Sequence, residues 1–118
     1  IAIDKDPTTR VFLHRIQNEY GDMIKFYNQS YADMEKNDDI AGRDDICGIV
    51  LDLGVSSMHL DNPLRGFSFR ESGPLDMRMG DQPGPTAFEI INLCSETTLA
   101  DLIFFYGQER KARKIGNV

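Results

Sequence analysis

The chain has 118 residues, a length that suits one domain with a modest core. Hydrophobic residues make up 41% and charged residues 27%, as in an ordinary soluble globular protein, and no stretch approaches the roughly 18 apolar residues of a membrane span. The net charge of -6 argues against nucleic-acid binding by bulk charge, but it leaves room for local basic surfaces.

The first part of the sequence predicts a strand followed by a helix. Residues 1–4, IAID, are typical of a short buried strand that ends on a carboxylate. Asp6 can cap a helix, and Pro7 suits the first helical position. One face of the expected helix repeats every fourth residue, with Phe12, Ile16 and Tyr20.

The middle of the sequence completes a strand and helix alternation. Residues 23–27 are the next strand candidate, and residues 31–36 predict a short helical turn. Residues 46–53, ICGIVLDL, give the clearest strand prediction, because near-continuous apolar character suits a parallel strand covered on both faces. This alternation is typical of an α/β fold with a parallel sheet and crossover connections.

The second half lacks the alternation of strands and helices. Residues 54–85 are rich in turn formers, yet they contain too many apolar side chains for disorder, so we expect an ordered functional loop. Residues 86–94 and 97–107 show helical spacing, and a third helix is expected to begin near Gln108. Thr86 and Thr97 are the expected N-caps.

Two carboxylates end predicted strands at the edge where open α/β sheets bind ligands. Asp4 can accept hydrogen bonds from both hydroxyls of a ribose, as nicotinamide-binding and S-adenosylmethionine-binding domains do, or it can cap the following turn. Asp52 opens DLGVSS, in which Gly54 lets the backbone approach a ligand, or it simply ends a strand. His59, after this loop, is either a packing residue or a ligand contact.

Cations gather in two places despite the acidic balance. The stretch RGFSFR, residues 65–70, alternates arginines with phenylalanines, which suits RNA phosphates and stacked bases or a turn with two core aromatics. Asp76 and Arg78 can form a half-buried ion pair that anchors the loop. The candidate RNA contacts are Arg65, Arg70 and Arg78 in the loop, and Arg110, Lys111, Arg113 and Lys114 at the end.

The long motif LDLGVSSMHLDNPLRGFSFRESGPLDMRM, residues 51–79, closely resembles the signature of the MraW/RsmH family. These are S-adenosylmethionine-dependent methyltransferases that modify a cytidine of small-subunit ribosomal RNA at N4. The resemblance continues through AIDKDP and LADLIFFYGQERKARKI and spans essentially the whole chain. The family's Gly-Gly-His cofactor loop, its first strand and its later strands have no counterpart here, so we expect a piece cut at both ends.

The resemblance implies an architecture and a role for single residues. It implies a Rossmann-like class I methyltransferase core in residues 1–60, an ordered functional loop in 61–85 and part of a helical RNA-recognition insertion in 86–118. Asp4 would bind the ribose, Tyr31 would lie against the adenine, and Asp52 would contact the cofactor and act in catalysis. His59 stands where the family usually has Gln and is expected at the cofactor.

The implied activity is methyl transfer from S-adenosyl-L-methionine to the N4 of cytosine, with small-subunit ribosomal RNA as partner and neither a metal nor a membrane. A cytoplasmic location is expected, or the mitochondrial matrix for a eukaryotic protein. Two other functions stay open: a non-catalytic RNA-binding or ribosome-assembly module with this fold, and a nicotinamide-dependent oxidoreductase suggested by Asp4 alone. The sequence leaves the oligomeric state open.

Overall fold

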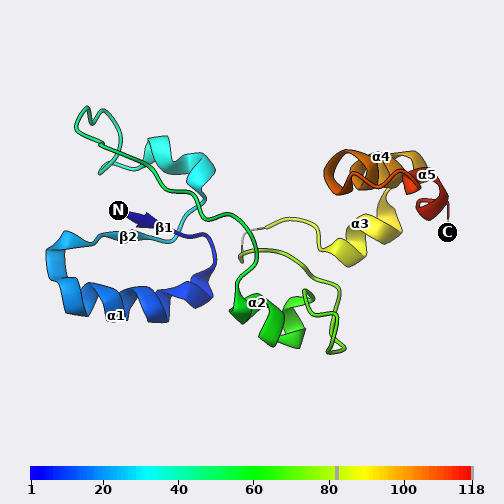
Figure 1. Ribbon diagram of the computed structural model, residues 1–118, viewed down its shortest axis with the longest axis horizontal. Helices are drawn as coiled ribbons and strands as arrows, with labels where there is room; N and C mark the ends of the chain where they lie inside the picture. The colour runs from blue at the N-terminus through cyan, green and yellow to red at the C-terminus, as the bar shows by residue number, and fades with distance from the viewer. Residues whose placement is uncertain (82, 118) are drawn as a thin grey trace. The chain divides into compact units, whose positions relative to one another are not determined.

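The structure, a computed structural model, describes residues 1–81 and 83–117 and is drawn in Figure 1. The chain divides into two compact units. The first comprises Ile1–Val55 and Met79–Pro83, and the second comprises Ser56–Arg78 and Gly84–Val118. The division expected from sequence, at residues 60 and 85, stays a prediction. Within the described residues, no helix has the length and apolar character needed to cross a membrane.

A two-stranded parallel sheet forms the centre of the first unit. Strand β1 (Ala2–Ile3) pairs with β2 (Phe26–Tyr27), with Ala2 opposite Phe26 and Ile3 opposite Tyr27. Helix α1 (Arg10–Tyr20) connects the two strands and runs beside them (Figure 1). The predicted strand–helix–strand order and the parallel pairing are therefore confirmed.

Short 3-10 helices mark the turns of this unit. Asp6 caps η1 (Pro7–Thr9), with Pro7 in the first turn as predicted, and η1 leads directly into α1. The strand expected at 23–27 is shorter in the structure. Met23 belongs to η2 (Gly21–Met23), and β2 begins at Phe26. The helical turn expected at 31–36 is confirmed as η3 (Tyr31–Lys36).

The prediction of a buried strand at residues 46–53 is wrong for this structure. The segment has no assigned strand, and its apolar side chains are exposed, Val50 to 95%. A strand exists only as part of a hydrogen-bonded ladder, and no other strand among the described residues pairs with this segment. Apolar character alone indicated burial, but it does not supply the neighbouring backbone that a strand needs.

The second unit is helical. Its elements are α2 (Ser57–Asp61), η4 (Pro63–Arg65), α3 (Ala87–Leu93), α4 (Glu96–Gly107) and α5 (Ala112–Ile115). The long expected loop thus begins with a short helix, which sequence reasoning missed. Thr86 caps α3 as predicted and forms a capping box with Glu89.

Two helix boundaries differ from expectation. The N-cap of α4 is Ser95 and not Thr97, because the Ser95 side chain accepts the N–H of Thr98. The third helix starts at Ala112 and not near Gln108. Gln108 itself has a left-handed backbone, with φ of 52°, and this ends α4.

Small residues allow α4 and α5 to pack side by side (Figure 1). Ala100 and Ala112 are 1% and 2% exposed and are the fully buried apolar residues among those described. A methyl group added to Gly116 would lie 3.1 Å from the Cβ atom of Ala100. The two helices therefore approach closely because this seam carries almost no side-chain volume.

Two glycines close the loop that follows α2. A Cβ atom on Gly73 would lie 2.7 Å from the carbonyl carbon of Pro63, so the backbone there has no room for a side chain. Gly66 has φ of 75°, and a Cβ atom on it would lie 2.7 Å from the amide nitrogen of Asp76. The loop thus folds back on itself through backbone contact.

Replacing Gly73 with alanine is expected to destabilise the protein by about 1–3 kcal/mol, because the methyl group would push the two loop segments apart. The matched control is Gly84→Ala, where a Cβ atom meets nothing within 4 Å. This change should be neutral or slightly stabilising. Urea unfolding of the two variants measures the difference, and equal stabilities would contradict the close packing at Gly73.

Candidate functional site

Asp4 lies where the chain leaves the carboxyl end of β1. Its N–H donates to the carbonyl of Tyr27 at 3.2 Å, which extends the pairing of β1 with β2 by one residue. The Asn28 side chain donates to the Asp4 carbonyl at 2.8 Å. Backbone and side-chain contacts from the end of β2 therefore fix the position of Asp4 at the edge of the sheet.

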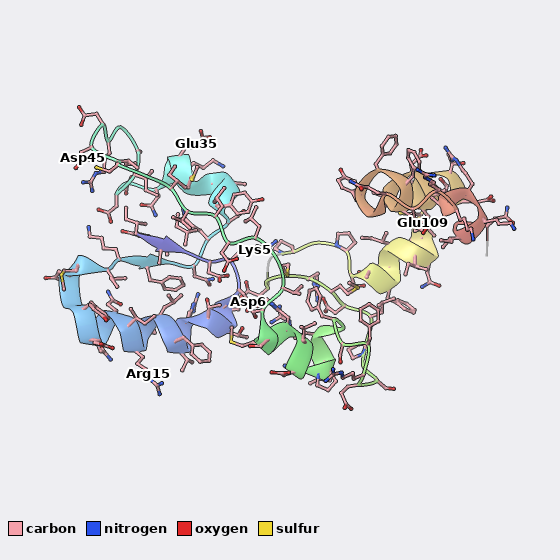
Figure 2. All side chains as sticks on the ribbon, viewed as in Figure 1. Lys5, Asp6, Arg15, Glu35, Asp45 and Glu109 are labelled. Atoms are coloured by element: carbon pink, nitrogen blue, oxygen red, sulfur yellow. The ribbon has the colours of Figure 1, made fainter. Side chains whose placement is uncertain are left out.

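The turn after Asp4 is organised by two carboxylates. Oδ1 of Asp4 accepts the N–H of Asp6 at 2.8 Å, so the capping role foreseen for Asp4 is present. Asp6, labelled in Figure 2 between β1 and α1, is 1% exposed. It accepts hydrogen bonds from the N–H of Thr8 at 2.9 Å and from its hydroxyl at 2.7 Å. The Asp4 side chain uses only Oδ1 in this turn. Its Oδ2 has no hydrogen-bond partner among the described residues, so this oxygen can accept a hydrogen bond from a ligand hydroxyl.

A cleft of about 610 Å³ lies in the first unit and is lined in part by β1. Ile3 of β1, Tyr31 at the start of η3 and residues 46–51 contribute to its lining. Asp4 follows Ile3 directly, and Asp52 follows Leu51, the last residue of the lining segment. Of the four predicted cofactor residues, Tyr31 lines the cleft, whereas Asp4 and Asp52 each follow a lining residue in sequence. The sequence did not predict this cleft.

The Asp52 side chain is exposed, and the backbone after it turns sharply. Gly54 has φ of 145°, a conformation that favours glycine, and a Cβ atom there would meet nothing within 4 Å. The chain can therefore bend at Gly54 and leave open space around the loop. This arrangement gives Asp52 the accessibility that a hydrogen-bond acceptor for a bound ligand requires.

An ion pair lines another part of this cleft. Nε of Arg43 donates to Oδ1 of Asp45 at 2.6 Å, and both residues are among those that line the cleft. The hydrogen bond from Arg43 lowers the pKa of the Asp45 carboxyl. Asp45 is labelled in Figure 2 on the loop before residues 46–51. The cleft thus combines apolar walls with a charged pair, which sequence reasoning missed because the loop seemed only polar.

His59 has a structural role in the second unit. It is 6% exposed, and its Nδ1 accepts the N–H of Ser56 at 2.9 Å, which closes a capping box at the start of α2. Its ring also lies 5.2 Å from the ring of Phe67. Packing, one of the two roles left open by the sequence, is therefore observed for His59, whereas a cofactor contact stays a prediction.

Asp76 and Arg78 form the ion pair that the sequence suggested. Arg78 donates from Nε to Oδ1 at 2.8 Å and from Nη2 to Oδ2 at 2.7 Å. The hydrogen bond from Arg78 lowers the pKa of Asp76 to about 2, and the pair raises the pKa of Arg78. Met77 between them has φ of 59°, which reverses the chain and brings the two side chains together.

The remaining predicted RNA contacts differ in their surroundings. Arg65 is half-buried and donates from Nη2 to the Arg78 carbonyl at 2.9 Å, whereas Arg70 is exposed. Arg113 pairs with Asp101 of α4 at 2.8 Å. Arg110, Lys111 and Lys114 are exposed on and before α5. The structure therefore places all seven cations in the second unit, and their binding to RNA stays a prediction.

All 118 residues match the model of the MraW methylase family. The chain belongs to this family. It is 45% identical over 117 residues to a protein of Rhodospirillum rubrum and 43% identical over 114 residues to one of a Cyanothece species. Both relatives are named ribosomal RNA small subunit methyltransferase H.

The alignments cover nearly the whole chain but only part of each relative of the MraW methylase family. They cover 99% and 97% of this chain, but 36% of the Rhodospirillum protein and 37% of the Cyanothece protein. A relative from Sorangium cellulosum with the same name is 40% identical over 115 residues, again with 36% of its length covered. The chain thus spans about a third of the length of these relatives. The predicted family resemblance is confirmed.

The Asp76–Arg78 pair predicts a defined pH dependence. The pKa of Asp76 is lowered to about 2 in the folded state, against about 3.9 in an unfolded chain. The stabilisation from this carboxylate is therefore fully present above the unfolded value and is lost as the pH falls towards the folded value. Asp76→Asn should lower the free energy of unfolding by a constant amount above about pH 5. This difference from the parent should shrink as the pH falls towards 2.

Urea unfolding across this pH range measures the difference between the parent and Asp76→Asn. The control is the same substitution in an Arg78→Met background, where the pH-dependent difference should shrink because the guanidinium is missing, although the N–H of residue 78 still donates to the carboxylate. A difference between parent and Asp76→Asn that persists unchanged to pH 2 would show that the ion pair does not lower the pKa of Asp76.

Proposed function

We propose that the gene product containing this chain is an S-adenosylmethionine-dependent methyltransferase that modifies the N4 of a cytidine in small-subunit ribosomal RNA. The observation that carries this proposal is the match of all 118 residues to the MraW methylase family. The names of the relatives support ribosomal RNA of the small subunit as the substrate. The cofactor and the N4 position come from the resemblance of residues 51–79 to the family signature.

The same proposal extends to the architecture. We infer that the parallel pair β1–β2 is part of a Rossmann-like sheet and that α3, α4 and α5 belong to an inserted helical region that recognises RNA. Methylation of small subunits is expected where these subunits assemble, in the cytoplasm or, for a eukaryotic protein, the mitochondrial matrix. Membership of a methylase family makes the nicotinamide-dependent oxidoreductase the weaker reading of Asp4.

The residues around the cleft have the chemistry that this cofactor needs. A ribose offers two hydroxyl donors, and Oδ2 of Asp4 is an acceptor at the carboxyl end of a parallel strand. An adenine offers a flat apolar face, and the Tyr31 ring lines the cleft with Ile3 and Ile40. When bound, S-adenosylmethionine supplies an electrophilic methyl group on a sulfonium.

The chain must then orient a weak nucleophile. The exocyclic nitrogen of cytosine delocalises its lone pair into the ring, so a hydrogen-bond acceptor has to hold its amino hydrogens and direct the lone pair towards the methyl carbon. The exposed carboxylate of Asp52 is such an acceptor. The target base has to leave its stack to reach this group.

Asp52→Asn tests this assignment because it keeps the shape of the side chain and removes its charge. The variant should fold normally and transfer methyl groups on the order of 10²-fold more slowly or worse. The assay is methyl transfer by the full-length gene product to undermethylated small ribosomal subunits. Asp44→Asn, on an exposed loop of the same unit, is the matched control and should keep the parent rate. A folded Asp52→Asn enzyme at the parent rate would remove Asp52 from the catalytic site. A full-length parent that transfers no methyl groups would instead support the non-catalytic RNA-binding alternative.

Asp4→Ala tests cofactor binding separately from chemistry. The loss of a hydrogen bond between a charged group and the ribose should weaken S-adenosylmethionine binding by about 1.5–3 kcal/mol. Isothermal calorimetry on the full-length gene product measures this change, with Asp22→Ala in η2 as an exposed control that should bind like the parent. Unchanged affinity of a folded Asp4→Ala variant would remove Asp4 from the site.

A further inference from the structure

The two phenylalanines of the RGFSFR stretch have opposite surroundings. Phe67 is half-buried, and its ring packs against that of His59. Phe69 is fully exposed, at 107%, and the next residue, Arg70, is exposed as well. The sequence left open whether both aromatic rings belong to the core. The structure assigns Phe67 to packing and leaves Phe69 on the surface.

The backbone around Phe69 is held in place from within the loop. The Ser68 hydroxyl accepts the N–H groups of Arg70 and Glu71, each at 3.2 Å. At the base of the loop, the N–H of Met77 donates to the Arg65 carbonyl at 3.0 Å. A side chain presented by a fixed backbone loses less conformational entropy when it binds than one on a free loop.

A single exposed aromatic residue is common on protein surfaces and indicates little by itself. The neighbouring Arg70 changes this, because an exposed aromatic residue followed by an exposed arginine offers groups that match the two parts of a nucleotide, the base and the phosphate. An apolar protein surface over Phe69 would in contrast desolvate the Arg70 charge without pairing it. Arg78 is paired with Asp76 and Arg65 is half-buried, so Arg70 is the exposed arginine among these three.

We propose that Phe69 and Arg70 bind one unpaired nucleotide of the RNA, with its base stacked on the phenyl ring and its phosphate paired with the guanidinium. This inference rests on the proposed function and names a positioning contact for the same RNA. Phe69, in the second unit, would hold a nucleotide other than the cytidine that is methylated. The stacking contact involves no charge, whereas the Arg70 contact does. Loss of the Arg70 contact should therefore change how the affinity for RNA depends on salt concentration, and loss of the stacking contact should not.

The experiment uses the full-length gene product and a short single-stranded RNA with one 2-aminopurine, whose fluorescence is quenched when it stacks. Phe69→Ala and Phe69→Leu should lose the quenching and bind about ten-fold more weakly with an unchanged salt slope. Phe69→Trp should keep both quenching and affinity. Arg70→Ala should reduce the slope of affinity against salt by about one. The matched control is Phe12→Ala, which removes a ring that is 52% exposed on α1 of the first unit and should behave like the parent.

Quenching and affinity in Phe69→Ala equal to those of the parent would overturn the inference. A lower unfolding temperature of Phe69→Ala than of Phe12→Ala without RNA would also overturn it, because Phe69 would then be covered by protein. Methyl transfer to undermethylated small subunits by the parent tests the proposed function itself. A parent that transfers methyl groups but quenches no 2-aminopurine would therefore refute the nucleotide contact alone.

Discussion

The buried carboxylate of Asp6 determines where the first strand stops and the first helix begins. It is 1% exposed and accepts both the N–H and the hydroxyl of Thr8. Burial of a charge is tolerated only when hydrogen bonds replace the lost water, and the first turn of a helix supplies such donors. With the turn fixed in this way, Asp4 stays at the end of β1, beside the end of β2. The candidate cofactor edge therefore depends on a residue that need not touch the cofactor.

Features that depend on neighbouring residues could be predicted from the sequence. Asp6 before Pro7, and Thr86 three residues before Glu89, are local capping patterns, and both caps are present. The Asp76–Arg78 pair could also be predicted, because its two residues are only two positions apart. Its geometry depends on the left-handed backbone of Met77, which the residue type did not predict. Ser95 in place of Thr97 shows the limit of such patterns, because adjacent hydroxyl residues are equally good caps by composition.

Features that depend on distant residues could not be predicted in the same way. Residues 46–53 have the composition of a buried strand, but the ladder that makes a strand needs a second backbone. The cleft likewise arises where β1, η3 and this segment meet, so no single motif contains it.

His59 is an intermediate case. The resemblance puts it where the family usually has Gln, and the structure shows its Nδ1 making the hydrogen bond that Gln makes in a capping box.

The predicted cofactor carboxylates and the predicted RNA-binding cations lie in different units. The predicted cofactor residues Asp4 and Asp52 lie in the first unit with the cleft, and all seven predicted RNA-binding cations lie in the second. A chain with a net charge of -6 repels a polyanion as a whole, so RNA binding has to come from locally concentrated cations. Salt weakens such contacts strongly, whereas hydrogen bonds to an uncharged ribose respond little to salt. If both sites act as proposed, ionic strength should change the affinity for RNA while the affinity for the cofactor stays nearly constant, and this separates the contributions of the two units without any mutation.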